Sequence, residues 1–277
     1  MKLRYIALGL DEYIAGNMYS SIFDYHTRFI CNYLSRMIRK VKFETDGTFN
    51  QIYIEVGEKK APHIFLDNLV VSVPFNKEKY EKAIKSKDCS YFADLLERGF
   101  EQARHFKPIP YEELLNILNE FKTNKYDNSW LIKQKIFRDE NLKVKLMGHL
   151  TIDVFYATAH FYSYPKPQEL SSGILFSTLP DEIHFAKTIS DISIKDRKLF
   201  FHDYIFKEDE IIEIDIDKIK LGEYNYKFIE IPKHCINDIE SLGWHQEYIK
   251  NWSYLNALIS NGAELDVEDI LSNLSSQ

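Results

Sequence analysis

A run of alternating acidic and apolar residues is the clearest polar pattern in the chain. Residues 210–218 read Glu-Ile-Ile-Glu-Ile-Asp-Ile-Asp-Lys. In an extended strand, Glu213, Asp215 and Asp217 would share one face, because successive side chains point to opposite sides of a sheet. Carboxylates at this spacing repel each other weakly in water, and a cationic partner would relieve that repulsion. The pattern therefore predicts either the solvated face of a sheet or a contact surface for a basic partner; paired carboxylates could also hold Mg²⁺.

Negative charge is concentrated at the C-terminal end of the chain. Residues 235–277 contain seven acidic residues and one lysine, which accounts for −6 of the net charge of −7. Residues 28–42, in contrast, contain five basic residues and no acid. An acidic surface can steer a basic protein partner and raise its association rate. Acids at the start of the last expected helix also have a local explanation, since the helix dipole favours negative charge there.

Tyrosine side chains suit such a surface, because the ring buries a large area while the hydroxyl keeps its hydrogen bonds. Two tyrosines follow the acidic run closely in the sequence. We therefore predict a partner-binding set of carboxylates and tyrosines: Glu213, Asp215, Asp217, Tyr224, Tyr226, Asp266, Glu268 and Asp269.

The histidines offer a weaker pattern. His149 and His160 fall on adjacent expected strands with Asp153 between them, and could approach as a metal or acid–base site. Hydrogen-bonded, partly buried histidines are the commoner outcome in a sheet. His234 and Cys235, with His245 nearby, carry metal-compatible atoms, but the eleven-residue gap matches no zinc spacing. No catalytic residue, metal ligand or cofactor is predicted.

Composition excludes several classes. Glycine is scarce, at 10 of 277 residues, and the sequence contains no GxxxxGK[ST], GxGxxG, HExxH or GxSxG motif. The net charge of −7 argues against a general nucleic-acid binder, whose affinity comes from neutralising phosphates.

The three cysteines are odd in number and widely separated, which is typical of reduced thiols. No apolar stretch of about 18 residues is present to span a membrane, and we expect a cytoplasmic protein.

Helical periodicity marks the N-terminal half. Residues 17–41 place apolar side chains at steps of three and four, which predicts one buried helical face. Its members are Met18, Ile22, Tyr25, Phe29, Tyr33 and Met37. A second helical stretch covers residues 76–106, with a break around 86–90, and a third begins near Pro110.

Strands account for most of the remainder. Residues 3–10 predict a short strand, and residues 49–56 and 63–75 predict a hairpin. From Asn128 onward, strands follow one another without intervening helices, which favours an antiparallel meander. The fold expected is α+β: an antiparallel meander sheet with flanking helices, a mixed N-terminal part and a helical C-terminus.

A boundary is expected at residues 164–172, which contain two prolines and two serines. This segment would separate residues 1–163, a mixed α+β region, from residues 173–277, with antiparallel strands followed by helices. One continuous domain is the alternative.

Residues 126–162 resemble segments of bacterial polymorphic-toxin immunity proteins. The likeness lies in a Trp-containing strand (YDNSWLIKQKIF, 126–137), then a Lys-alternating strand and an aromatic strand (LKVKLMGHLTIDVFYATAHFY, 142–162). The resemblance implies a cytoplasmic inhibitor that binds one cognate toxin stoichiometrically, commonly a basic nuclease. It implies no catalytic residues.

The leading hypothesis is thus a non-catalytic binding protein with a basic protein partner and neither nucleic-acid nor membrane binding. The alternative is a metal-dependent hydrolase or nuclease with a site assembled from His, Asp and Glu. A structural or assembly subunit is a third possibility. The sequence leaves the partner's identity and the oligomeric state open.

Overall fold

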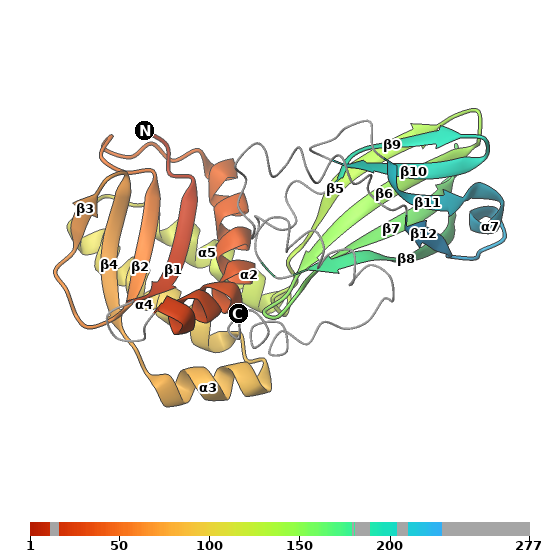
Figure 1. The fold of residues 1–277 in the computed structure, drawn as a ribbon. Coiled ribbons are helices and arrows are strands. Elements are labelled where there is room, and N and C mark those ends of the chain that lie inside the picture. Colours follow the sequence, from red (N-terminus) through yellow and green to blue (C-terminus); the bar gives the residue numbers. More distant parts are fainter. Residues whose placement is uncertain (12–16, 179, 181–188, 204–209, 229–277) are drawn as a thin grey trace, which may run out of the picture. The chain divides into compact units, whose positions relative to one another are not determined.

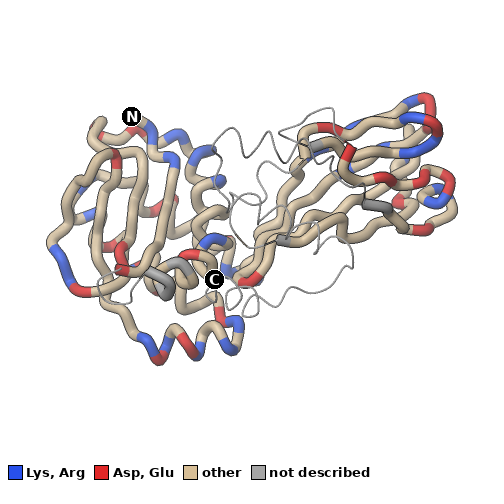
Figure 2. Tube along the Cα trace, in the orientation of Figure 1, with Lys and Arg blue, Asp and Glu red and all other residues tan. Residues whose placement is uncertain are grey.

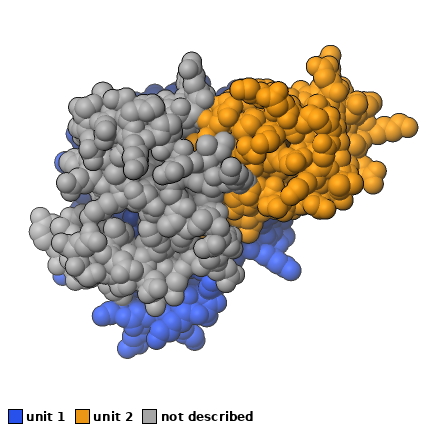
Figure 3. Space-filling view, turned by 45° about the vertical axis from the view of Figure 1, so that its right-hand side comes forward, with its two compact units in different colours: residues 1–128, 151–153 blue, residues 129–150, 154–277 orange. Residues whose placement is uncertain are grey.

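A computed structural model describes residues 1–11, 17–178, 180, 189–203 and 210–228. The chain divides into two compact units (Figures 1 and 3). Unit 1 comprises residues 1–128 and 151–153, and unit 2 comprises residues 129–150 and 154–277. Helices and sheets are both present, so the α+β prediction is confirmed; the expected helical C-terminus lies outside the described residues.

Unit 1 contains a mixed four-stranded sheet in the order β1-β2-β4-β3 (Figure 1). Its strands are β1 (Tyr5–Leu10), β2 (Gln51–Gly57), β3 (His63–Phe65) and β4 (Asn68–Pro74). Strands β1 and β4 both run parallel to β2, whereas β3 and β4 are antiparallel.

The predicted hairpin between residues 49–56 and 63–75 is therefore wrong. Residues 63–75 form two strands rather than one, because the chain turns at Leu66 and Asp67. Leu66 has a φ of 51°, in the left-handed region that glycine and asparagine favour. A leucine at such a position leaves no turn signal in the sequence.

The helices of unit 1 agree with the periodicity. They are α2 (Asn17–Val41), α3 (Lys77–Ser86), α4 (Ser90–Phe106) and α5 (Tyr111–Thr123). Helix α2 contacts β1, α4 contacts β2 and β4, and α5 contacts both α2 and α4. Among the helices that the structure describes, none combines the length and apolar character needed to cross a membrane.

Helix α2 also covers the free edge of β1. The hydroxyls of Ser20, Thr27 and Ser35 donate to carbonyl oxygens of every second residue of β1, from Ile6 to Leu10, over 3.1, 3.0 and 3.3 Å. An uncovered strand edge is a template for pairing with another chain. The hydroxyl row of α2 satisfies these edge groups within unit 1.

The buried face of α2 differs from the predicted one. Phe23, Ile30, Leu34 and Ile38 are fully buried, and so is Phe29, which was predicted. Four of the other predicted members are only half-buried: Ile22, Tyr25, Tyr33 and Met37. Because α2 packs against β1 on one side and α4 and α5 on another, its core side is wider than one apolar stripe.

Unit 2 is built from two four-stranded antiparallel meanders (Figure 1). The first contains β5 (Ser129–Phe137), β6 (Leu142–Leu150), β7 (Phe155–Ser163) and β8 (Glu169–Thr178). The second contains β9 (Ile189–Lys195), β10 (Lys198–Asp203), β11 (Glu210–Asp215) and β12 (Tyr226–Phe228), with the short helix α7 (Ile216–Lys220) after β11.

Each sheet of unit 2 buries one face. Along β6, every second residue from Leu142 to Leu150 is buried, as the alternation predicts. The two sheets are linked along both margins. On one side, Lys135 of β5 pairs with Asp191 of β9 at 2.8 Å. On the other, Tyr224 donates its hydroxyl to the Ile174 carbonyl of β8 at 2.9 Å.

The expected boundary at residues 164–172 lies inside unit 2, where the chain turns between the paired strands β7 and β8. The first passage of the chain from unit 1 to unit 2 lies between Asn128 and Ser129.

Candidate functional site

The acidic run of the sequence spans a strand end and a helix start. Strand β11 ends at Asp215, and α7 begins at Ile216. Asp217 therefore belongs to α7, so the prediction that Glu213, Asp215 and Asp217 share one strand face is wrong.

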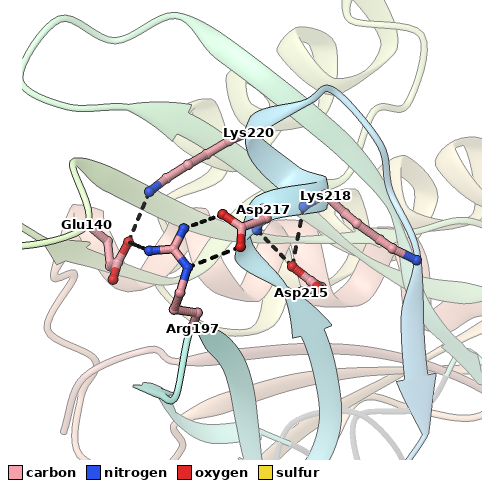
Figure 4. Close-up of polar contacts among 6 residues, drawn as sticks. All are labelled: Glu140, Arg197, Asp215, Asp217, Lys218 and Lys220. Carbon is pink, nitrogen blue, oxygen red and sulfur yellow. Dashed lines mark hydrogen bonds and ion pairs between the residues drawn. The ribbon is translucent and has the colours of Figure 1, made fainter.

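The reason is a helix cap at Asp215. Its side chain accepts hydrogen bonds from the backbone N–H of Asp217 at 2.8 Å and of Lys218 at 3.4 Å (Figure 4). Aspartate at this position satisfies N–H groups that have no partner within the helix. This local bonding competes with continued extension of the strand.

Asp217 belongs to a network of opposite charges that we call the turn network: Glu140, Arg197, Asp217 and Lys220 (Figure 4). Arg197 binds both carboxylate oxygens of Asp217, with its Nε 3.0 Å from Oδ2. Lys220 donates to Glu140 at 2.9 Å, and Arg197 lies 3.9 Å from the same carboxylate. The hydrogen bond from Arg197 lowers the pKa of Asp217. The network joins the β5–β6 turn, the β9–β10 turn and α7.

The other described members of the predicted binding set also have internal partners. Glu213 pairs with Lys198 across β10 and β11 at 2.8 Å. The Tyr224 hydroxyl is bound to β8, and its ring centroid lies 5.6 Å from that of Tyr226. Figure 2 shows basic and acidic residues next to each other at the turns of unit 2. These side chains hold unit 2 together, and partner binding by them stays a prediction. Asp266, Glu268 and Asp269 lie outside the described residues.

The cap at Asp215 gives a direct test of this structural role. We expect Asp215→Ala to lower the free energy of unfolding of unit 2 by about 1 kcal/mol, the usual effect of removing an N-cap. Asp215→Asn should preserve stability, because the amide oxygen can accept the same hydrogen bonds. Urea unfolding of both variants measures the difference; equal stability of Asp215→Ala and the parent chain would contradict the capping role.

A second candidate site lies on the face of the β5–β8 sheet opposite its buried side. We call this the outer face. Strand register arranges it as four cross-strand rows. The rows are Ser129-His149-Tyr156-Ser177, Leu131-Met147-Thr158-Ile174, Gln134-Lys145-His160-Ser172 and Ile136-Lys143-Tyr162-Glu169.

A continuous chain of hydrogen bonds, the polar relay, crosses all four strands of this face. Ser129 Oγ lies 2.9 Å from His149 Nδ1, and His149 Nε2 lies 2.9 Å from Thr158 Oγ1. Thr158 Oγ1 lies 3.1 Å from His160 Nε2, and His160 Nδ1 lies 2.9 Å from Glu169 Oε1. Both ring nitrogens of each histidine thus have a partner within the relay.

Aromatic rings flank the relay. His149 stacks on Tyr156 with centroids 4.9 Å apart, and His160 stacks on Tyr162 at 6.4 Å. Lys145 lies 5.1 Å from the centroid of Tyr162. Stacking on Tyr156 restrains the plane of the His149 ring, which keeps its nitrogens aligned with the relay.

The ionised carboxylate of Glu169 sets the direction of the relay when both histidines are neutral. The hydrogen bond from His160 lowers the pKa of Glu169, so this side chain only accepts at neutral pH. His160 must then carry its proton on Nδ1, and its Nε2 accepts from Thr158. Thr158 accepts in turn from Nε2–H of His149, whose Nδ1 accepts from Ser129. Every donor points toward Glu169.

The alternative metal site is not assembled among the described residues. His149 and His160 both approach Thr158, whereas Asp153 forms an ion pair with Lys87 at 2.6 Å. No cluster of three or more His, Cys, Asp or Glu side chains with metal-binding geometry occurs in the described ranges.

The described cysteines do not present an activated thiol. Cys31 is buried, and burial raises the pKa of Cys89 to about 11, so this thiol stays protonated at neutral pH. Cys235, with His234, lies outside the described residues.

Sequence reasoning anticipated that His149 and His160 could approach, but it missed Ser129, Thr158 and Glu169. The available signal was strand parity, which places residues 156, 158, 160 and 162 on one face. Comparison with known proteins supplies no further guide: no protein-family model, curated protein or solved structure matches the chain significantly.

Proposed function

We propose that this chain is a non-catalytic binding protein of the immunity type, an inhibitor that neutralises a toxin by stoichiometric binding. The outer face of unit 2 provides the main contact. The strands that carry the resemblance to immunity proteins are three of the four strands of this face, β5, β6 and β7.

The supporting observation is the exposure of apolar side chains on the outer face. Leu131, Ile136 and Ile174 are 50%, 41% and 41% exposed. Tyr156 and Tyr162 lie on β7, a strand between β5 and β8 in the sheet, and are half-buried. Exposed aliphatic groups around rigid rings are typical of surfaces that a protein partner buries.

Charge gives the partner's class. Within unit 2, Glu213 and Asp217 are already paired with Lys198 and Arg197, so they have little attraction left for a partner. The acidic residues of 235–277 carry most of the chain's net charge and would attract a basic toxin over long range. Association should therefore slow as salt rises, while the contact itself is made by apolar groups.

The product of the neighbouring reading frame is the partner to test. We expect it to form a 1:1 complex with the chain and to lose its toxicity on co-expression. Leu131→Ser and Ile174→Ser should each weaken the complex about tenfold, the effect of removing about 1.4 kcal/mol of contact energy. Calorimetric titration measures the affinity.

Leu221→Ser is the matched control, because Leu221 is 77% exposed but follows α7 and belongs to none of the four rows of the outer face. Its affinity should equal that of the parent chain. A neighbouring product that neither binds nor is neutralised would contradict the inhibitor function. Unchanged affinity of both outer-face variants would exclude this face as the contact.

A further inference from the structure

The polar relay joins four strands in a way that a set of separate side-chain contacts would not. Each of its two histidines uses both ring nitrogens. The Thr158 hydroxyl lies within hydrogen-bond distance of one nitrogen of each ring, at 2.9 and 3.1 Å. A hydroxyl has one proton, so Thr158 can donate to only one histidine at a time. The protonation states of the two rings are therefore coupled through Thr158.

We propose that the polar relay is a proton-driven switch. Uptake of one proton at Ser129 places a positive charge on His160 and reverses the three hydrogen bonds between these residues.

The protons balance in this transfer, because each atom between the solvent and His160 that gives up a proton is on a residue that gains another. In one concerted step, a solvent acid gives a proton to Ser129 Oγ while the proton that Ser129 held moves to His149 Nδ1, so Ser129 stays a neutral hydroxyl and the acid leaves as its conjugate base. The Nε2 proton of His149 moves to Thr158 Oγ1, and the proton of Thr158 moves to His160 Nε2. His160 becomes an imidazolium, His149 remains neutral in its other tautomer, and Ser129 changes from donor to acceptor toward the ring.

The surroundings decide which ring takes the charge. Glu169, from β8, is the carboxylate on the outer face, and it contacts His160 directly at 2.9 Å. Lys143 and Lys145, from β6, oppose a positive charge, but Lys145 lies over the ring of Tyr162. Strand β5 places no charged side chain in the four rows. An imidazolium at His160 would form an ion pair with Glu169, whereas the relay gives His149 only hydroxyl partners, so we place the charge on His160.

The consequence reaches across the sheet. Protonation of His160 on β7 changes the hydrogen-bonding character of Ser129 on β5, although no charge appears at β5 itself. The outer face thus presents a different donor pattern at low and high pH.

Nitrogen-15 NMR of the histidine rings in the full chain tests the switch. His149→Gln and His160→Gln assign the two signals. We expect neutral tautomers with Nε2–H on His149 and Nδ1–H on His160 at high pH. On acidification, His160 should become doubly protonated and His149 should change tautomer, with one shared midpoint. His202, whose Nε2 contacts Ser193 at 2.6 Å outside the relay, serves as the internal reference.

A pair of substitutions at Thr158 separates coupling from folding. Thr158→Ser keeps the hydroxyl and should preserve the shared midpoint. Thr158→Val removes it, and the tautomer change of His149 should be lost while the His202 signal is unchanged. Separate midpoints in the parent chain, a doubly protonated His149, or an unaltered His149 response in Thr158→Val would each overturn the proposal.

Discussion

Replacement of Phe29 by alanine is expected to lower the free energy of unfolding of unit 1 by about 3–5 kcal/mol, the usual cost of removing a buried aromatic ring. Phe29 is fully buried, and its ring contacts three others from different elements. The centroid distances are 6.0 Å to Phe92 of α4, 6.0 Å to Phe121 of α5 and 6.5 Å to Tyr126. Because these rings are held by separate elements, they cannot all move inward to fill the cavity.

Hydrogen exchange of the β1 and β2 amides, measured across a denaturant series, gives the loss of unfolding free energy within unit 1. Phe65→Ala is the matched control, since Phe65 is 61% exposed and its truncation opens no cavity. The control should differ from the parent chain by less than about 0.5 kcal/mol. A loss below about 1 kcal/mol for Phe29→Ala would show that this cluster is not a central part of the core.

Local patterns predicted most elements of unit 1 but not their pairing. Helix α2 begins and ends where the periodicity and the basic residues of its last turn indicate. The pairing of β2 with β4 depends instead on the turn at Leu66, where a leucine adopts a backbone conformation that it rarely takes. Leu66 is 78% exposed, and the turn is tied to the rest of the sheet by backbone hydrogen bonds from Asn50 and Gln51 to the Asp67 carbonyl, at 2.9 and 3.3 Å. These long-range bonds leave no local signal, so the sequence around the turn resembles an unbroken strand.

Polar patterns were misleading where a side chain bonds to its own backbone. Residues 212–217 alternate as a strand should, and β11 follows that alternation from Ile212 to Asp215. At this point the carboxylate caps α7 and ends the strand. Alternation cannot distinguish a carboxylate that faces solvent from one that accepts backbone N–H groups.

The polar relay was only half predictable because it depends on register. Parity places His149 and His160 on one face, but their link to Ser129 and Glu169 requires the pairing of four strands. Irregularities shift that pairing at three points: between Leu131 and Lys133, between Ala157 and Thr158, and between Phe161 and Tyr162. A one-residue shift exchanges the two faces of a strand, so the members contributed by β5 and β8 could not be read from alternation.

Acid sensitivity of unit 1 should originate from His26. This side chain is 8% exposed, and its Nδ1 lies 2.8 Å from the hydroxyl of Tyr80. Burial lowers the pKa of His26 from 6.5 to about 4, with a smaller opposing effect from Asp153. The folded state therefore favours the neutral ring, and the unfolded chain takes up a proton first as pH falls.

The sign and the pH window follow from these two values. The contribution of neutral His26 is fully present above pH 6.5 and is lost as pH falls toward 4. The loss should be about 2 kcal/mol by pH 5 and approach about 3 kcal/mol below pH 4, since one pKa unit corresponds to about 1.4 kcal/mol. The ionised carboxylates of Asp46 and Glu101 have pKa values lowered to about 2, whereas their unfolded forms titrate near 4. Their stabilising effect is therefore lost only as pH falls from about 4 to about 2, below the window of His26.

His26→Gln removes the titrating ring and keeps a side chain that can bond to Tyr80. The free energy of unfolding of this variant, measured by hydrogen exchange of unit 1 amides, should change little between pH 7 and pH 5. His63→Gln, at an exposed histidine of the same unit, should keep the full decline of the parent chain. If His26→Gln declines as steeply as the parent, the acid sensitivity has another source and the buried ring does not need to be neutral for unit 1 to fold.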